Sequence, residues 1–357
     1  MSSSFGNLFR ITTFGESHGA GIGVIVDGVP SGMEISLADI QKELDRRRPG
    51  QSLMTTKRKE DDQVEILSGT FEDKTTGAPI AMLIRNRDAD SSKYDKIKHL
   101  HRPGHADFTY HHKYALRDHR GGGRSSGRET ACRVAAGAIA LKFLESKGIF
   151  IKAATTQIQD VEAKQWLEDE IENNPVRTAD PDVAEAMAER VKSAMAEGDS
   201  VGGVVECRIY GCPVGLGEPL YDKLDAMLAK AMFSIGTVRG LTFGNGFESA
   251  SLKGSENNDA MDESGFLSNR CGGVLGGLSN GMPIVMQMAI KATASIARYQ
   301  KTQSVEGETS ELRVEGRHDP CICPRAVPVV EAMAALTIAD AYLLACTQDP
   351  HLLSGNT

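Results

Sequence analysis

Two histidines and one aspartate lie in short segments whose rigid neighbours would hold them in place for proton transfer. His18 lies in the run FGESHG between two apolar stretches, His105 follows a Pro-Gly pair, and Asp319 follows Arg317 and His318. Imidazole titrates near neutral pH, and a cation beside a carboxylate keeps that carboxylate ionised and able to accept a proton. Taken singly, each segment is also compatible with a turn that carries a solvated polar residue.

A loop rich in arginine and glycine offers a site for an anion. The run RGGGRSSGRET, from Arg120 to Thr130, leads directly into an expected helix. Free backbone N–H groups, the helix dipole, serine hydroxyls and guanidinium groups would all favour a bound phosphate or carboxylate there. The Gly-Lys-Ser/Thr ending of a Walker loop is absent. A flexible loop of solvated arginines would leave their mutual repulsion unexplained, so anion binding is the favoured interpretation.

A second cationic segment lies near the end of the chain. The run KATAS, residues 291–295, places a cation and two hydroxyls at a strand end, where they could contact a second anion or simply form a loop. Residues 85–133 hold twelve Arg and Lys against six Asp and Glu, although the whole chain carries a net charge of -8. Together these residues indicate a site for a phosphorylated acid, and they fit removal of phosphate or a proton-coupled elimination.

The composition excludes several classes of protein. The 357 residues are 40% hydrophobic, enough for a globular core, and the acidic net charge argues against a dedicated nucleic-acid binder. No apolar run approaches the roughly 18 residues that cross a bilayer, and the N-terminus lacks a signal-peptide pattern. The seven cysteines, Cys321 and Cys323 among them, lack the spacing of a zinc site. We therefore expect a soluble, cytoplasmic protein with reduced thiols, no metal, and no membrane or nucleic-acid partner.

Helix and strand patterns account for most of the chain. Ser36 and Asp39 form a capping signature for a helix over 37–47. Residues 87–126 show no clear period and are expected to form a long loop. The other patterns predict helices over 129–147, 182–197, 221–233 and 326–346, and strands over 8–14, 22–27, 64–68, 79–85, 202–210, 238–243 and 283–291.

The two halves of the chain repeat one another. The run DGVPSG before the first helix is matched by YGCPVG before the helix over 221–233, and GAPIAM at residue 77 is matched by GMPIVM at residue 281. We therefore expect one α+β domain over 1–357, with pseudo-symmetric halves at roughly 1–150 and 200–350 and helices between antiparallel sheets. Chance similarity of Gly-Pro turns is the alternative.

The motifs, in order over nearly the whole chain, resemble the chorismate synthase family. FGESHG with VDGVPSG, DRRRPG, RPGHAD, RGGGRSSGRETA, GGVLGGLSNG, and GRHDPC with RAVPVVEAM are similar to that family's signatures. The resemblance implies a homotetramer with a β-α-β sandwich core that converts 5-enolpyruvylshikimate 3-phosphate to chorismate and phosphate by anti-1,4 elimination. It implies reduced FMN as cofactor, with NADPH as a possible reductant, because a ring C–H is too weakly acidic for an imidazole or carboxylate to remove unaided.

The resemblance also assigns roles to individual residues. It implies that His18 protonates the departing phosphate, that His105 stabilises or protonates the reduced flavin, and that Asp319 is the base towards flavin N5. The implied substrate-binding residues are Arg47, Arg102, Arg128 and Arg317. The implied flavin-binding residues are Arg124, Ser125, Ser126, Gly236, Thr237, Gly276, Lys291, Ala292, Thr293, Ala294, Ser295 and Arg317. Ala292 and Ala294 replace the Pro and Ser of many relatives, and Leu53 departs from the family pattern in a way that puts a nicotinamide contact around Arg47 in doubt.

Two other functions remain open at the level of sequence. A phosphatase or phospholyase without flavin could use His18 and His105 for acid-base catalysis. A non-catalytic polyanion-binding or RNA-binding module could use the basic segment 85–133, although 5% aromatic residues provide few platforms for stacking bases. Dependence on flavin separates the first of these from a chorismate synthase.

Overall fold

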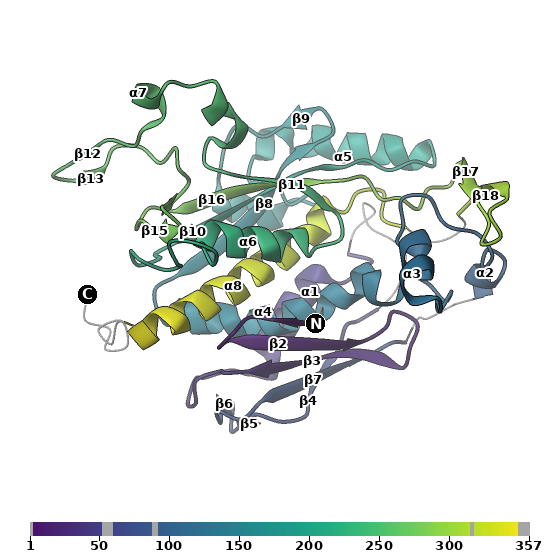
Figure 1. Ribbon diagram of the computed structural model, residues 1–357, viewed down its shortest axis with the longest axis horizontal. Coiled ribbons are helices and arrows are strands. Elements are labelled where there is room, and N and C mark those ends of the chain that lie inside the picture. The colour runs from purple at the N-terminus through teal and green to yellow at the C-terminus, as the bar shows by residue number, and fades with distance from the viewer. Residues whose placement is uncertain (1–2, 52–59, 88–91, 315–317, 349–357) are drawn as a thin grey trace.

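Two five-stranded antiparallel sheets enclose a layer of helices, as Figure 1 shows for the computed structural model. The structure describes residues 3–51, 60–87, 92–314 and 318–348. The first sheet has the order β1 (Ser4–Phe5), β2 (Arg10–Gly15), β3 (Gly21–Asp27), β7 (Ile80–Arg85), β4 (Val64–Ile66). The second has the order β11 (Val238–Phe243), β16 (Ile284–Ile290), β10 (Gly203–Tyr210), β8 (Phe150–Ile158), β9 (Val161–Glu162). The expected α+β architecture with helices between antiparallel sheets is confirmed.

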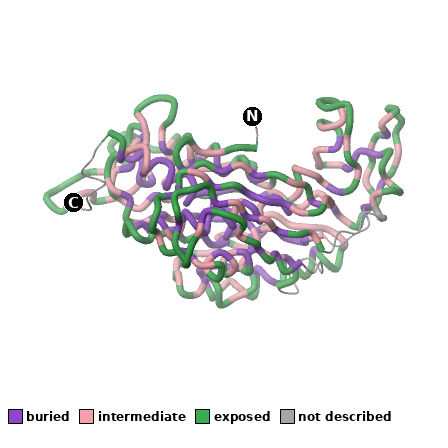
Figure 2. Tube along the Cα trace, turned by 90° about the horizontal axis from the view of Figure 1, so that it is seen from below, coloured by how far each residue is buried: buried purple, intermediate pink, exposed green. Residues whose placement is uncertain are grey.

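Four helices fill the space between the sheets. Helix α4 (Thr130–Glu145) packs on the first sheet and α8 (Cys323–Gln348) on the second, and the two pack closely on each other. Helix α1 (Leu37–Arg47) contacts both of them, and α6 (Leu224–Phe233) contacts α8 and β11. Figure 2 shows the buried part of the chain running through the middle of the molecule, with exposed loops at its edges. The central helices and the inner faces of both sheets therefore form the core together.

The two sheets are built in the same order along the chain. In the first half two strands (β2, β3) are followed by a helix (α1), two strands (β4, β7) and a long helix (α4). In the second half β8 and β10 are followed by α6, β11, β16 and α8, and corresponding strands hold corresponding places in their sheets. The repetition expected from the Gly-Pro motifs thus extends to topology, while the division at about residue 150 stays a prediction.

Helix α8 is a core helix. By length and composition its 26 residues could cross a membrane, and within the described residues it is the one helix of which this is true. However, 83% of its most apolar window is buried inside the protein. Its apolar character is accounted for by the contacts with α4, α6 and the second sheet.

Most of the predicted elements agree with the structure. The helix over 37–47 is confirmed, including its capping box, in which Ser36 accepts from the backbone N–H of Asp39 at 3.2 Å. The strand over 238–243 is also confirmed, and the other predicted elements differ by a few residues at their ends. Strand β8 was not predicted, and the expected long loop over 87–126 contains short helices.

The remaining elements lie outside the two large sheets and the central helices. The other α-helices are α2 (Ser92–Asp95), α3 (Asp107–Tyr114), α5 (Pro181–Ala196) and α7 (Gly254–Asn257), and the 3-10 helices are Gly123–Ser125, Gly127–Glu129, Glu168–Asn173 and Gly246–Ala250. The two-stranded hairpins are β5 (Thr70–Phe71) with β6 (Lys74–Thr75), β12 (Met261–Asp262) with β13 (Gly265–Phe266), β14 (Val274–Leu275) with β15 (Leu278–Ser279), and β17 (Tyr299–Gln303) with β18 (Thr309–Arg313).

Candidate active site

His18 lies in the turn between β2 and β3 and is backed by the arginine-rich loop. A Cβ atom on Gly121, whose φ is +85°, would lie 2.4 Å from Nδ1 of His18, so only glycine permits this approach. The side-chain amide of Asn86 donates to the backbone oxygens of Glu16 and Gly19 at 2.9 and 2.8 Å and fixes the turn. The imidazole is therefore positioned by two loops that are distant in sequence.

Arg102 is held beside the same loop. Its Nε and a terminal nitrogen donate to the Asp107 carboxylate at 2.7 and 2.8 Å, and it also donates to the backbone oxygen of Gly121 at 3.3 Å. Arg117 forms a second ion pair with Asp107 at 3.0 Å. Burial disfavours the charged guanidinium, but Asp107 outweighs this effect and raises the pKa of Arg102. Asp107 thus orients an arginine at this site.

Arg47 and Arg128 share one buried carboxylate. Arg47, in the last turn of α1, is 2% exposed and contacts Oδ2 of Asp62 at 2.5 Å. Arg128 forms an ion pair with Oδ1 of Asp62 and donates to Oδ1 of Asn86 at 3.0 Å. Burial lowers the pKa of Arg47 to about 10. Burial also opposes ionisation of Asp62, yet the two guanidinium groups hold the pKa of Asp62 below its usual value.

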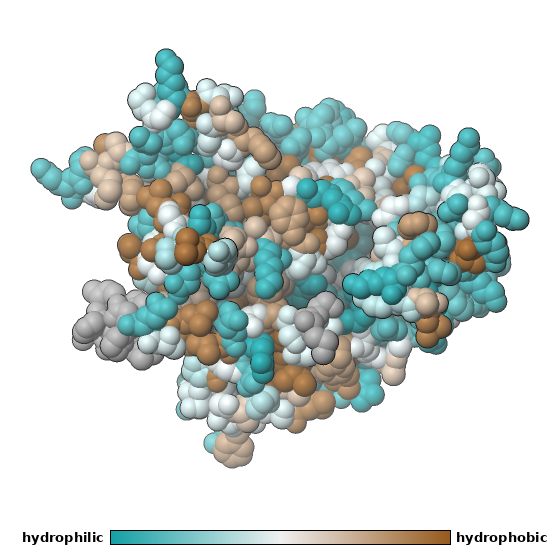
Figure 3. Space-filling view, viewed as in Figure 1, coloured by the Kyte–Doolittle hydropathy of each residue, from teal (hydrophilic) through white to brown (hydrophobic). Residues whose placement is uncertain are grey.

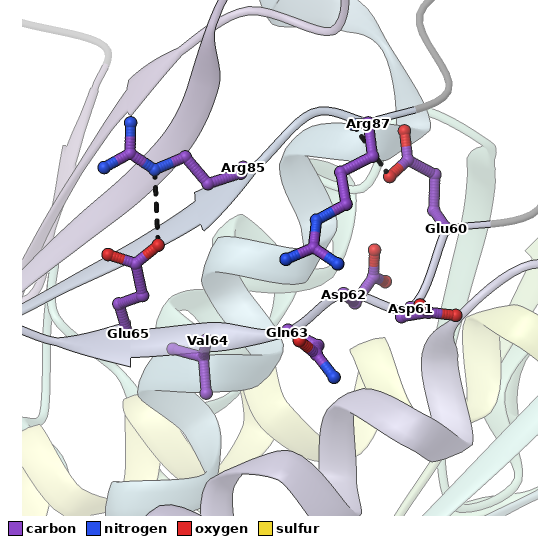
Figure 4. Close-up of a pocket in the computed structure, with 8 residues that line it drawn as sticks. All are labelled: Glu60, Asp61, Asp62, Gln63, Val64, Glu65, Arg85 and Arg87. Atoms are coloured by element: carbon purple, nitrogen blue, oxygen red, sulfur yellow. Dashed lines mark hydrogen bonds and ion pairs between the residues drawn. The ribbon is translucent and has the colours of Figure 1, made fainter.

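A cavity opens beside this cluster. It has a volume of ≈ 130 Å³, and its lining includes Asp62, Glu60, Arg85 and Arg87. Figure 4 shows the Arg87 side chain extending over Asp62, while its backbone N–H donates to Glu60 at 3.3 Å. The buried arginines therefore lie next to space that is lined by charged groups.

Asp319 is joined to the same cluster by Arg325 at the start of α8. A terminal nitrogen of Arg325 contacts Oδ2 of Asp319 at 2.5 Å, and Nε of Arg325 donates to the backbone oxygen of Arg47 at 3.2 Å. Asp319 is 9% exposed. Arg325, in the last helix, therefore contacts both the predicted base and the backbone of a predicted substrate-binding arginine.

His105 contacts the segment after β16. Its Nε2 lies 2.6 Å from Oγ of Ser295, and Nζ of Lys291 donates to the backbone oxygen of Gly104 at 3.1 Å. The backbone N–H of Lys291 in turn donates to the oxygen of Thr237 at 2.9 Å. Burial, and next the charge of Arg102, lower the pKa of His105 to about 4, so the imidazole is neutral near pH 7.

The loop that holds Arg124, Ser125 and Ser126 is ordered by the first sheet. Arg124 donates to Oγ1 of Thr13 at 2.6 Å and to the backbone oxygen of Gly15 at 3.1 Å. Ser125 is exposed, and Ser126 accepts from the backbone N–H of Arg128 as the N-cap of a 3-10 turn. The loop thus contacts the end of β2, next to the His18 turn, and continues along the chain to Arg128.

The structure unites most of the predicted residues and separates one of them. Contacts through Gly121, Asn86, Asp62 and Arg325 link His18, Arg102, Arg124, Arg128, Arg47 and Asp319, and His105 joins Lys291, Ser295 and Thr237. Gly236 directly precedes Thr237, and Ala292 to Ala294 lie between Lys291 and Ser295. Gly276 lies on the turn between β14 and β15, at the opposite end of β16 from Lys291. Arg317 and Leu53 lie outside the described residues.

Three residues of the cluster were not identified from sequence. Asp62, Asn86 and Arg325 carry no local pattern that separates them from other polar residues, because their role depends on contacts with distant segments. Only the short spacing between Asp319 and Arg325 could have suggested an ion pair across the first turn of a helix. No three His, Cys, Asp or Glu side chains are grouped for a metal ion in the part of the chain that the structure describes. All seven cysteines are free thiols, and Cys271 alone among them is not buried.

Comparison with known proteins places the chain in a family. The family model described as chorismate synthase matches residues 9–343. Chorismate synthase of Synechocystis is 55% identical over 353 residues, covering 96% of this chain and 98% of that protein, and chorismate synthase of Methanocella arvoryzae is 55% identical over 347 residues, covering 95% and 93%. A crystal structure of chorismate synthase superimposes with a TM-score of 0.79 at 31% identity and covers 98% of this chain and 96% of that one. The chain therefore belongs to the chorismate synthase family.

Proposed function

We propose that this protein uses the cluster around His18, His105 and Asp319 to convert 5-enolpyruvylshikimate 3-phosphate to chorismate and phosphate with reduced FMN. The protein is a phosphate-eliminating carbon–oxygen lyase of the shikimate pathway, which leads to aromatic amino acids. The observation that carries the proposed site is that buried arginines from the end of α1, the 3-10 turn before α4 and the loop before α3 are each held by a buried carboxylate, next to the segments that carry His18, His105 and Asp319.

The arginines are the proposed substrate-binding groups. The substrate carries one phosphate and two carboxylates, and each needs compensation when it leaves water. Arg47 and Arg128 share Asp62, with Glu60 3.8 Å from Arg128, and Arg102 and Arg117 share Asp107, so four guanidinium groups face three carboxylates. Guanidinium groups fixed by a carboxylate on one side present their other N–H groups in a rigid plane that suits phosphate. By family resemblance Arg317 is a fourth substrate-binding arginine.

His18 and Asp319 are the proposed proton-transfer groups. His18 projects from a rigid turn against the loop that carries Arg124 and Arg128, which supports its proposed role as the acid that protonates the departing phosphate. Asp319 is held by Arg325 and is the proposed base on the flavin side of the site. Both groups work best when fixed close to the atom whose proton they move.

Two segments of the proposed site fit FMN. The loop of Arg124, Ser125 and Ser126, beside the His18 turn, offers a cation and hydroxyls for an anion. In the segment 291–295 that contacts His105, Oγ1 of Thr293 is buried without a hydrogen-bond partner, as expected of a group that contacts a ligand. When bound, reduced FMN would supply electron density as phosphate departs and would recover it with the ring hydrogen, chemistry that no side chain here provides. His105, hydrogen-bonded to Ser295, would contact the reduced cofactor. The remaining proposed contacts are Gly236, Thr237, Lys291, Ala292, Ala294 and Arg317.

The source of reducing electrons and the assembly remain predictions. Arg47 donates to Asp62, Thr130 and Gly127 and is 2% exposed, so both its substrate role and a nicotinamide contact stay predictions from the family resemblance. NADPH as reductant and a homotetramer are expected from the family resemblance, and a cytoplasmic location is expected from the composition of the sequence.

An anaerobic assay tests the proposed function. Purified protein is given 5-enolpyruvylshikimate 3-phosphate with dithionite-reduced FMN, with NADPH and FMN, or without flavin, and chorismate and phosphate are measured. We expect chorismate with dithionite-reduced FMN and none without flavin. Equal phosphate release without flavin would support the phosphatase alternative. In the arm with NADPH and FMN, chorismate forms only if the protein itself reduces the flavin with NADPH.

Two variants test the proton-transfer groups. His18→Ala and Asp319→Ala should each lower turnover by more than about tenfold, because each removes a positioned acid or base. His99→Ala, at an exposed histidine away from these groups, is the matched control. Circular dichroism and thermal unfolding must show that the variants are folded. Turnover near that of the wild type in either variant would remove that residue from its proposed role.

A further inference from the structure

The aromatic ring of Tyr94 contacts two residues of the proposed site. Tyr94 lies in α2, and the centroid of its ring is 5.3 Å from that of His18, with the two ring planes at 77°. The guanidinium carbon of Arg102 lies over the same ring, 5.4 Å from its centroid. Both distances are typical of favourable aromatic and cation–π contacts. One side chain of α2 therefore touches the proposed proton donor and a proposed substrate-binding arginine.

The backbone of the arginine-rich loop connects the same two side chains. The oxygen of Gly121 accepts from Arg102 at 3.3 Å, and a Cβ on Gly121 would lie 2.4 Å from Nδ1 of His18. His18 and Arg102 are thus linked twice, once through a ring and once through a backbone. The imidazole and the guanidinium are therefore neighbours in space, although they are far apart in the sequence.

Contacts on two sides hold α2 in place. Asp95, the residue after Tyr94, accepts from or pairs with Nε2 of His119 at 2.9 Å, and Leu100 pairs with Ser304 of the segment that joins β17 to β18. Figure 1 shows α2, α3 and this hairpin together at one end of the molecule. The surface over these elements is mostly hydrophilic in Figure 3, whereas the half-buried ring of Tyr94 packs on the imidazole and the guanidinium.

An aromatic ring can orient a cation without neutralising it. The Asp107 carboxylate already accepts from Nε and a terminal nitrogen of Arg102. A further carboxylate would compete with bound phosphate for this guanidinium group. The face of an aromatic ring carries only partial negative charge, so it attracts the guanidinium and excludes water but adds no formal charge. The ring of Tyr94 therefore suits a site that must keep its affinity for anions.

We propose that Tyr94 is a positioning residue whose ring holds His18 and Arg102 at a fixed spacing, so that both reach the same phosphorylated substrate. The inference rests on the proposed function, because His18 and Arg102 have their roles only there. The contact depends on the ring and not on the hydroxyl. Without the ring, both side chains gain freedom to turn away, and the substrate is less well aligned with its proton donor.

Two variants at Tyr94 separate the ring from its hydroxyl. Tyr94→Phe keeps the ring and should leave kcat and KM within about twofold of the wild type. Tyr94→Leu removes the ring, and we expect kcat to fall and the KM for 5-enolpyruvylshikimate 3-phosphate to rise, each at least about threefold. Steady-state kinetics with saturating dithionite-reduced FMN measure both constants.

Tyr114 provides a matched control. Its ring lies 5.6 Å from that of Tyr110 at 87°, and Nζ of Lys113 lies 5.3 Å from its centroid, so it makes the same two kinds of contact. Tyr114 is exposed and touches none of the proposed proton-transfer groups in these contacts. Tyr114→Leu should leave kcat and KM within about twofold. Circular dichroism and thermal unfolding check that both leucine variants are folded.

A double variant tests whether the ring acts through His18. In His18→Ala the proposed proton donor is already absent. Adding Tyr94→Leu to that background should therefore lower kcat by less than about twofold, while KM still rises through the effect on Arg102. A general loss of stability would lower kcat by the same factor in both backgrounds.

The outcomes keep the two proposals apart. If the wild type forms no chorismate with reduced FMN, the proposed function fails, and the inference fails with it. If the wild type is active and Tyr94→Leu matches it, only the inference is overturned. A loss in Tyr94→Phe as large as that in Tyr94→Leu would make the hydroxyl the essential group and overturn the inference too. An equal fall in kcat with and without His18 would do the same.

Discussion

Asp62 is the residue on which the two buried arginines depend. Asp62→Asn preserves shape but removes the countercharge between Arg47 and Arg128, so both guanidinium groups should lose their fixed orientation. We expect the KM for 5-enolpyruvylshikimate 3-phosphate to rise by about tenfold, with a smaller change in kcat, because misplaced binding groups weaken alignment of the substrate. Steady-state kinetics at saturating reduced FMN measure this.

The neighbouring Asp61 provides the control for this experiment. Asp61 is exposed at the rim of the same cavity, so Asp61→Asn should leave KM within about twofold. Asp62→Glu restores the charge and should recover part of the affinity. A kcat that falls while KM stays constant would show that Asp62 acts on the chemical step and not on the orientation of the arginines.

His105 should make the protein sensitive to acid. Its pKa falls from 6.5 to about 4 on folding, so the folded protein binds fewer protons than the unfolded chain in this range. This contribution to stability is fully present above pH 6.5 and is lost as pH falls towards 4, and it amounts to about 3 kcal/mol. Urea unfolding at several pH values should show a shallower loss for His105→Asn than for the wild type. His99→Asn should leave the slope unchanged.

Elements with a clear period were predictable, and those covered on both faces were not. Helix α1 carries its own capping box and an apolar stripe, so its limits follow from local chemistry. Strand β8 begins with alternating exposure but continues through three consecutive buried residues, Ala153 to Thr155, because further segments cover its outer face. Its composition, rich in Ala and Thr, has neither a strong period of two nor a continuous apolar run. The burial of this outer face depends on tertiary contacts with distant segments, which no local sequence pattern indicates.

The contact between α4 and α8 depends on one glycine. A Cβ on Gly137 would lie 2.3 Å from Cβ and 2.6 Å from Cα of Ala332, and backbone atoms there cannot move without shifting a helix. Gly137→Ala gains about 1 kcal/mol of helix propensity but should lose about 1 to 3 kcal/mol by overpacking. We therefore expect a net fall in the thermal midpoint.

Gly254 offers a control for the substitution by alanine. It begins α7, and a Cβ on it would meet nothing within 4 Å, so Gly254→Ala should change the free energy of unfolding by less than about 0.5 kcal/mol. Thermal unfolding of both variants provides the comparison. A midpoint for Gly137→Ala at or above that of the wild type would mean that the helices separate at little cost.

At the scale of the whole molecule, the sequence repeat predicts the core better than the site. The Gly-Pro turns and the helices after them recur in both halves, and so do the sheets that they build. The site lies in segments that differ between the halves. The first half contributes the loop before α4, and the second half contributes the residues after β16 and before α8. Motifs located these segments, but only the fold shows that Asp62, Asn86 and Arg325 connect them.

The two ends of the chain are joined through one buried aspartate in the last helix. Asp340 is 4% exposed, and its carboxylate accepts backbone N–H groups of Asn7, Leu8 and Phe9 at distances of 2.7 to 3.0 Å. Asp340→Asn keeps the volume but turns one acceptor oxygen into a donor that faces these N–H groups. Hydrogen bonds to a charged group contribute about 1.5 to 3 kcal/mol each, so the free energy of unfolding should fall by at least about 2 kcal/mol.

Urea unfolding monitored by circular dichroism measures this loss, with Asp160→Asn as the control. Asp160 pairs with Arg190 on the surface at 2.7 Å, and exposed pairs of this kind contribute little to stability because water screens them. If Asp340→Asn were no less stable than Asp160→Asn, the first residues would not be held by α8. The first sheet would then depend on its own packing against α4, and the N-terminal strand could be removed without loss of the core.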